Sequence, residues 1–155
     1  MRKDVAKLMN ATGSYVIFSA MSGTPVKCLD VTRASQQGGA KIILYENTGN
    51  DNQVFHLCKV KGDYYAIVAD HSLMVLDVEK ASTRNGTPIV QWPYHGGDNQ
   101  LWKKKDLKDG TCLLCSKLNE DLVLDVQGKK RDNGTPLILY KYTGGDNQKF
   151  RLSAV

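Results

Sequence analysis

The sequence predicts an all-β fold built from three similar units, and three observations support this prediction. The triplet Asp-Asn-Gln occurs at 51–53, 98–100 and 146–148, and the triplet Leu-Asp-Val occurs at 29–31, 76–78 and 124–126. Both triplets step by 47 and then 48 residues. The segments between them are short apolar, aromatic and β-branched runs bounded by Gly, Asn and Pro, which is the pattern of strands joined by turns. Repeats of this length indicate one structural unit that occurs three times.

Each repeat contains four candidate strands in the same order. The first strand segment opens with a glycine and covers 13–18, 62–67 and 110–115. The second carries the Leu-Asp-Val triplet and leads into a turn at Gly38-Gly39, Asn85-Gly86 or Asn133-Gly134, where residues that tolerate positive φ favour a tight reversal. The third covers 42–45, 89–92 and 137–140. After a glycine-containing loop, the fourth is expected to begin at the Asp-Asn-Gln triplet.

About twelve strands in three repeats restrict the possible architectures. A propeller typically needs ~4–8 blades, so three units are too few. Three units about a pseudo-threefold axis close a barrel without an exposed sheet edge, which is a β-trefoil. We therefore expect one domain over residues 1–155, with repeats at about 13–59, 62–107 and 110–155.

Composition excludes several classes of protein. The 155 residues carry a net charge of +5, and no apolar run approaches the ~20 residues of a membrane-spanning helix. The basic runs 103–105 and 129–131 lack the aromatic-rich surroundings of single-strand binding proteins, so we expect solvated loops and no nucleic-acid partner. The first ten residues interrupt their apolar residues with charges, unlike a secretory signal. The expected location is cytoplasmic, or outside the cell by a non-classical route; the alternative is that this sequence is a mature form.

The four cysteines do not follow the repeat. Cys28, Cys58, Cys112 and Cys115 occupy unrelated positions in the three units, which favours free thiols and a reducing compartment. Cys112 and Cys115 form a C-x-x-C sequence, but on a strand residues three apart point to opposite faces. No second pair or suitably spaced histidine accompanies them, so no metal and no cofactor is predicted.

The repeated motifs resemble a known family. Gln53-Val54-Phe55, Gln100-Leu101-Trp102 and Gln148-Lys149-Phe150 are similar to the Gln-x-Trp motif of ricin-B-type (R-type) β-trefoil lectins, and the resemblance runs from about residue 13 to the end. Many members join two half-cystines in each repeat; here Cys28 matches the first position but Asn47 matches the second. The resemblance therefore implies a version without disulfides, in which the Phe and Trp residues of the motif belong to the core.

A sugar-binding site requires an aromatic ring that covers the apolar face of the sugar and polar groups that both accept from and donate to vicinal hydroxyls. Each repeat has an Asp, an aromatic residue and an Asn in the same register. By resemblance, the Asp binds the hydroxyls that distinguish galactose, the aromatic stacks on the ring, the Asn adds a hydrogen bond and the following Gln supports the Asp. The expected binding residues are Asp30, Tyr45 and Asn52; Asp77, Trp92, His95 and Asn99; and Asp125, Tyr140 and Asn147, with Gln53, Gln100 and Gln148 as supports.

The resemblance implies a multivalent lectin with up to three equivalent sites for glycans that end in galactose or N-acetylgalactosamine. The second repeat, with Trp92 and His95, is expected to bind best. An alternative role for each Asp is to accept backbone N–H groups of the following turn. The alternative function is a non-lectin trefoil that binds heparin, a protease or actin through basic loops such as 103–105. Catalysis is not expected, because no nucleophile elbow or phosphate loop occurs and the three Asp residues lie in different repeats. The oligomeric state is not predicted.

Overall fold

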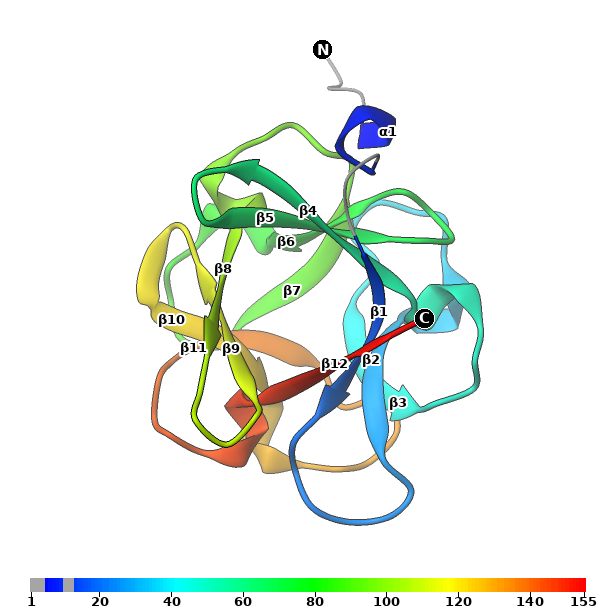
Figure 1. The fold of residues 1–155 in the computed structure, drawn as a ribbon, viewed down its shortest axis with the longest axis vertical. Coiled ribbons are helices and arrows are strands. Elements are labelled where there is room, and N and C mark those ends of the chain that lie inside the picture. Colours follow the sequence, from blue (N-terminus) through cyan, green and yellow to red (C-terminus); the bar gives the residue numbers. More distant parts are fainter. Residues whose placement is uncertain (1–4, 10–12) are drawn as a thin grey trace.

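The chain forms a closed barrel with three hairpins across one end (Figure 1). The computed structural model describes residues 5–9 and 13–155. Over these residues it contains twelve strands, as the β-trefoil prediction requires. The first repeat holds β1 (Ser14–Ser19), β2 (Lys27–Val31), β3 (Ile42–Glu46) and β4 (Phe55–Lys61). The second holds β5 (Tyr64–Ala69), β6 (Val75–Val78), β7 (Thr87–Trp92) and β8 (Trp102–Asp106). The third holds β9 (Cys112–Ser116), β10 (Asn119–Val126), β11 (Leu137–Lys141) and β12 (Phe150–Ala154).

Strand pairing shows how the barrel closes. The first and fourth strands of the three repeats form an antiparallel ring in the order β1, β4, β5, β8, β9, β12 and back to β1. The closing pair aligns Tyr15 with Ala154 and Ser19 with Phe150. The second and third strands pair as the hairpins β2–β3, β6–β7 and β10–β11. A ring of strands leaves no free edge in the barrel, so the fold needs no other protection against edge-to-edge pairing.

The hairpins also contact one another. β11 pairs with β7 through Ile138 and Pro88, and isolated bridges join Lys41 to Val90 and Ile43 to Pro136. Each hairpin therefore touches the next repeat. These contacts place the loops of one repeat beside the strands of another, which matters for the site described below.

The fourth strand begins later than predicted. In each repeat the Asp-Asn-Gln triplet forms a 3-10 turn, η3 (Asp51–Gln53), η5 (Asp98–Gln100) or η7 (Asp146–Gln148). The strand starts only at the aromatic residue that follows, Phe55, Trp102 or Phe150, all of which are buried in the main core. The turn frees the Asn and Gln side chains from the strand direction and lets them bond to groups on the second and third strands.

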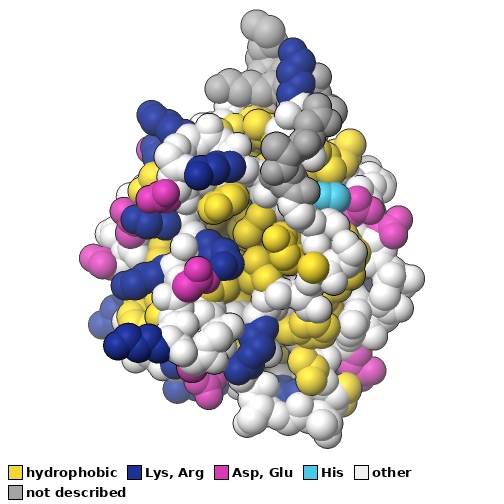
Figure 2. All heavy atoms as spheres, in the orientation of Figure 1, with side chains coloured by type: hydrophobic (Ala, Val, Ile, Leu, Met, Phe, Trp, Pro, Cys, Tyr) yellow, Lys and Arg dark blue, Asp and Glu magenta, His cyan; other side chains and the backbone are white. Residues whose placement is uncertain are grey.

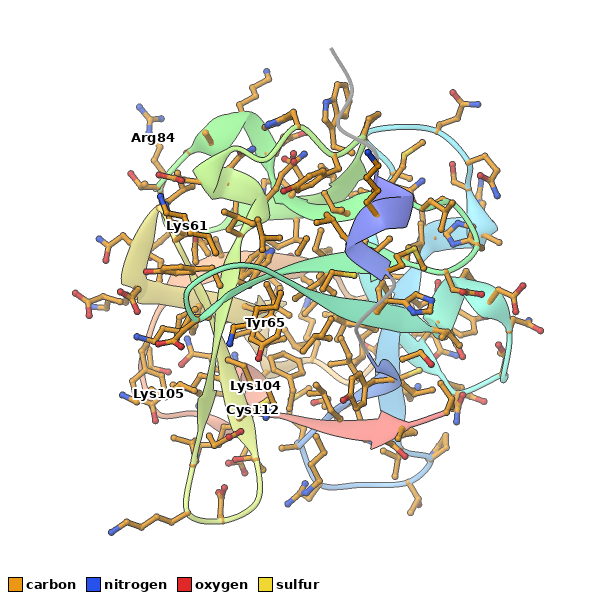
Figure 3. All side chains as sticks on the ribbon, turned by 45° about the horizontal axis from the view of Figure 1, so that its top comes forward. Lys61, Tyr65, Arg84, Lys104, Lys105 and Cys112 are labelled. Carbon is orange, nitrogen blue, oxygen red and sulfur yellow. The ribbon has the colours of Figure 1, made fainter. Side chains whose placement is uncertain are left out.

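The opposite end of the barrel carries a shallow cavity. It has a volume of about 410 Å³, and its lining includes Tyr15, Leu57, Tyr65, Lys104 and Leu152. Figure 2 shows apolar side chains at the centre of this end and Lys and Arg side chains nearby. Lys104 takes the position that leucine takes in the other two repeats, two residues after the buried aromatic, and it lies near Tyr65 (Figure 3).

The four cysteines are free and buried, in agreement with the sequence. Cys112 packs in the main core, whereas Cys115 packs with Leu113 and Val123 on the other face of β9. Burial raises the pKa of the Cys28 thiol to about 12 and that of Cys112 to about 11. Such thiols are mostly protonated at neutral pH and react slowly.

The described part of the N-terminal segment, residues 5–9, lies against the outside of the barrel. The helical turn α1 (Val5–Leu8) packs Val5 and Leu8 on a small apolar cluster that includes Cys58, Val68 and Tyr94. In residues 5–9 and 13–155, no helix has the length and apolar character needed to cross a membrane.

Candidate functional site

Three aspartates occupy equivalent positions just before the end of the second strand. Asp30, Asp77 and Asp125 are 5%, 4% and 4% exposed on β2, β6 and β10. Each is followed by a buried valine and a short turn with left-handed residues, namely η2 (Thr32–Ala34), η4 (Glu79–Ala81) or η6 (Gln127–Lys129). The hydrogen bonds that these carboxylates accept come from side-chain amides. The alternative in which the turn backbone holds the Asp is therefore not what the structure shows.

A fully buried glutamine holds each aspartate. In the second repeat, Gln100 Nε2 donates to Asp77 Oδ2 at 2.9 Å and to the Pro93 carbonyl at 3.0 Å, and Gln100 Oε1 accepts from the His95 N–H at 2.9 Å. Gln53 and Gln148 make the same set of bonds, with donor distances of 2.9 Å and 2.8 Å to the aspartates of the other two repeats. Each glutamine thus fixes a carboxylate and closes the loop after the third strand. It lies behind the cavity and does not line it.

The asparagine of each triplet bonds to the second strand. Asn52, Asn99 and Asn147 each donate Nδ2 to the carbonyl of the valine after the aspartate, at 3.1, 3.2 and 3.1 Å. Asn147 Nδ2 also donates to Asp125 Oδ1 at 3.1 Å. Asn147 Oδ1 is buried and accepts no hydrogen bond from the part of the chain that the structure describes.

These residues surround three separate cavities, one per repeat. The first site, of about 480 Å³, is lined by Asp30, Tyr45 and Asn52. The second, of about 290 Å³, is lined by Asp77, Trp92, His95 and Asn99. The third, of about 330 Å³, is lined by Asp125, Tyr140 and Asn147. The structure therefore brings together every aspartate, aromatic residue and asparagine that the sequence assigned to each site, and His95 with them.

A glycine from another repeat completes each cavity, which the sequence did not predict. Gly134 lines the first site, Gly39 the second and Gly86 the third. All three have φ near +90°, a conformation that side chains with a Cβ rarely adopt. Their N–H groups donate, each at 2.8 Å, to the carbonyl of the residue before the stacking aromatic: Leu44, Gln91 and Leu139. The Asn-Gly and Gly-Gly pairs in the sequence indicated a tight turn, but they did not indicate that each turn would line the site of another repeat.

The second site differs from the others at this wall. In the first site, Asn133 Oδ1 accepts from the Glu46 N–H at 3.0 Å. The equivalent of Glu46 is Pro93, which has no N–H, and Gly38 replaces the asparagine. A Cβ at Gly38 would lie 3.1 Å from the Trp92 ring. The glycine therefore leaves room for the larger indole, which is 46% exposed.

His95 borders the second site with a defined ring orientation. Its Nδ1 accepts from the Gly97 N–H at 3.0 Å, and a Cβ at Gly97 would lie 2.6 Å from the His95 ring. The acceptor role of Nδ1 leaves Nε2 as the protonated nitrogen of a neutral ring, and therefore as a donor. Thr48 and Thr143 occupy the equivalent loop positions in the other repeats.

The electrostatics of the three carboxylates are similar. Burial raises the pKa of Asp30, Asp77 and Asp125 above the ordinary value, and the hydrogen bonds from the glutamines oppose this rise. A desolvated carboxylate gains much from hydroxyl groups that donate to it. Among the described residues, no cluster of three or more His, Cys, Asp or Glu side chains is arranged to hold a metal ion. Each cavity thus combines a buried hydrogen-bond acceptor, an amide and an exposed or half-exposed aromatic surface.

Comparisons with known proteins agree with this description. Residues 6–92 and 51–140 match the model of the ricin-type β-trefoil lectin domain-like family. A designed threefold-symmetric protein, ThreeFoil, is 42% identical with a TM-score of 0.88, and the match covers 92% of this chain and 99% of that chain. An exo-β-1,3-galactanase from Clostridium thermocellum is 31% identical with a TM-score of 0.88, over 95% of this chain but 31% of that chain.

A more distant structure shares the fold. The C-half of the earthworm R-type lectin, in complex with GalNAc, is 20% identical with a TM-score of 0.69, and the match covers 92% of this chain and 99% of that chain. No curated protein sequence matches the chain.

Proposed function

Because the chain belongs to the ricin-type β-trefoil lectin family, we propose that it is a multivalent lectin for glycans that end in galactose or N-acetylgalactosamine. One observation carries the proposal: a buried Asp, an exposed or half-exposed aromatic ring and an Asn surround a cavity in each of three repeats. The related earthworm lectin half binds GalNAc. The Asp accepts from vicinal sugar hydroxyls, the ring covers the C–H face, and the amide adds a further hydrogen bond.

The second site should be the strongest of the three. Tryptophan offers the largest aromatic face, and Trp92 is the most exposed of the three aromatic residues. His95 adds an N–H donor beside Asp77 and Trp92. Each shallow site buries few sugar atoms and should bind a monosaccharide weakly, so strong attachment requires two or three sites on one branched glycan or glycan-covered surface.

The protein is proposed to bind sugars without cleaving them. A glycoside hydrolase needs two carboxyl groups ~5–9.5 Å apart at one bond. Asp30, Asp77 and Asp125 line three different cavities, and each is held by its own glutamine. The second cavity has a further carboxylate, Glu79, in its lining, but the first and third cavities, to which we assign the same function, have none among the described residues. The galactanase match covers less than a third of that enzyme, so it lends no catalytic role to this domain.

The alternative, binding of sulfated chains through residues 103–105, is less well supported. Lys103 Nζ pairs with Glu120 at 3.2 Å, and Lys104 Nζ pairs with Asp106 at 2.5 Å. Two of the three cations are thus partly neutralised by neighbours.

We further propose a reducing location, cytoplasmic or reached by non-classical secretion, in keeping with four free thiols. Thiols titrated in freshly isolated protein should react only after denaturation.

A glycan array at fixed salt, with free galactose as competitor, tests the proposed function. Binding to galactose- or N-acetylgalactosamine-terminated glycans that free galactose abolishes would support it. Binding only to sulfated chains, lost as salt rises, would favour the basic-loop alternative. A blank array would refute the lectin function.

A further inference from the structure

The rims of the three sites carry different charges, although the aspartates behind them are equivalent. Arg33 lines the first site, Glu79 and Lys80 line the second, and Lys129 lines the third. In the second site the lining holds two carboxylates, Asp77 and Glu79, against the single cation of Lys80. The third site has a cation and no second acidic residue in its lining.

Lys129 lies across the mouth of the third site. It is the last residue of η6, with φ of 57°, and its side chain reaches the loop that precedes η7. A Cβ at Gly145 would lie 3.1 Å from Lys129 Cε and 3.4 Å from its Nζ. The absence of a side chain at Gly145 therefore makes room for the ammonium group. Among the described residues, this group has no hydrogen-bonding or ion-pairing partner.

The same part of the third site contains a buried side-chain oxygen that accepts no hydrogen bond from the described residues. Asn147 is 5% exposed, and its Oδ1, which has no partner, would lie 2.6 Å from a Cβ at Gly145. The Lys129 ammonium thus ends beside the amide of Asn147, and it is close enough to Asp125 to lower the pKa of that carboxyl. A ligand in the third site would meet a carboxylate, an unsatisfied amide oxygen and a free cation.

We propose that the third site prefers galactosides that carry an anionic substituent, a sulfate ester or a carboxylate, and that Lys129 determines this preference. The inference rests on the proposed function. The sugar hydroxyls donate to Asp125, while the anionic substituent pairs with the Lys129 ammonium. The first site is not assigned this preference, because Arg33 is exposed on its rim and, among the described residues, no contact places its guanidinium beside Asp30 or Asn52.

Backbone amide shifts measure each site separately in the intact protein. Gly145 reports on the third site and Gly97 on the second. The probes are methyl β-galactoside, its 3-O-sulfate, its 6-O-sulfate and the corresponding galacturonide, titrated at 20 mM and 200 mM salt. The Kd at Gly145 should be about three-fold lower for at least one anionic galactoside than for the neutral one at low salt. At high salt the difference should shrink, and at Gly97 no anionic galactoside should bind more tightly than the neutral one.

Lys129→Gln should remove the preference, which is measured as the ratio of the Kd for the neutral galactoside to the Kd for the anionic one. Glutamine has the same left-handed backbone cost as lysine, so the fold is unaffected. Lys130→Gln, at an exposed neighbour outside the cavity lining, is the matched control and should keep the preference. Equal Kd values for neutral and anionic galactosides at Gly145 would overturn the inference and leave the lectin function standing. Inorganic sulfate that shifts Gly145 as strongly as the sulfated galactosides would also overturn it. No shift with any galactoside or with N-acetylgalactosamine at Asn50, Gly97 or Gly145, which report on the first, second and third sites, would refute the proposed function itself.

Discussion

Replacing Gln100 with glutamate tests whether this buried amide supports the carboxylate of Asp77. Gln100 is fully buried, and its Nε2 donates to Asp77 Oδ2 at 2.9 Å and to the Pro93 carbonyl at 3.0 Å. Glutamate has the same shape and keeps the acceptor that the loop N–H groups use. It replaces the donor, however, with a second carboxylate oxygen that faces the first.

The expected effect is large and depends on pH. At the 2.9 Å separation, two ionised carboxylates repel by about 6 kcal/mol at an effective dielectric of ~20. Keeping one proton on a carboxyl group with an ordinary pKa of ~4.3 costs about 4 kcal/mol at pH 7, so the folded variant retains the proton. The unfolded chain releases it. The variant is therefore most stable at low pH, and its free energy of unfolding relative to the unsubstituted protein falls by about 1.4 kcal/mol for each unit that the pH rises.

Urea unfolding of the variant and the unsubstituted protein from pH 5 to pH 8 measures this difference. We expect the variant to be less stable by about 1 kcal/mol at pH 5 and about 4 kcal/mol at pH 7. Gln100→Met, which removes the hydrogen bonds without adding a titratable group, should lower the free energy of unfolding with a weaker dependence on pH, which arises only from the further rise in the pKa of Asp77 when the Gln100 hydrogen bond is lost. A difference between Gln100→Glu and the unsubstituted protein that stays constant over this range would refute the assigned role of Gln100.

Three further predictions concern the sites and the barrel. Asp77→Ala combined with Asp125→Ala should remove most galactose binding in calorimetry, with an unchanged circular dichroism spectrum; a folded variant that binds as before would show that the assigned sites are wrong. In the unsubstituted protein, binding should weaken on acidification above the ordinary aspartate pKa of ~3.9, because burial raises the pKa of these carboxyls. Protonating a group whose pKa is raised in the folded state adds stability, so the protein should remain folded where binding is lost, and unfolding at that pH would contradict this explanation. Lys104→Leu should raise the free energy of unfolding by about 1 kcal/mol, because leucine fills this position in the other repeats and the ion pair with Asp106 contributes little. Lys105→Leu, at an exposed position, is the control. A loss of stability in Lys104→Leu would show that the barrel end does not favour apolar side chains.

The strands and the polar residues of the sites could be predicted because each depends on local spacing. The Leu-Asp-Val triplet alternates two buried apolar residues with one side chain that points the other way, which is a property of any strand. The Asp-Asn-Gln triplet recurs in register with it, so Asp77 and Asn99 could be assigned to one site without coordinates. The predicted start of the fourth strand was wrong, because Asp and Asn are depleted in strands and favour turns, and the triplet forms a 3-10 turn before the strand.

The wall of each site could not be predicted, because it comes from another repeat. Gly39 is far from Asp77 along the chain, and only barrel closure and the contacts between hairpins bring it to the second cavity. Nor does the sequence show that Lys129 crosses the third site, since its direction depends on a left-handed backbone and on the missing side chain of Gly145. Local pattern thus identified the polar groups, and tertiary closure determined the shape and charge around them.

The exchange of glycines among repeats has a consequence for fragments of the chain. The first site takes its glycine from the third repeat, the second from the first and the third from the second. A fragment of repeats one and two would keep one complete cavity, the second. A peptide of one repeat would have none until three copies assembled into a ring, so its sugar binding would rise with roughly the third power of peptide concentration. A circular permutant, which joins the neighbouring ends of β1 and β12 and opens the chain between two repeats, would keep all three.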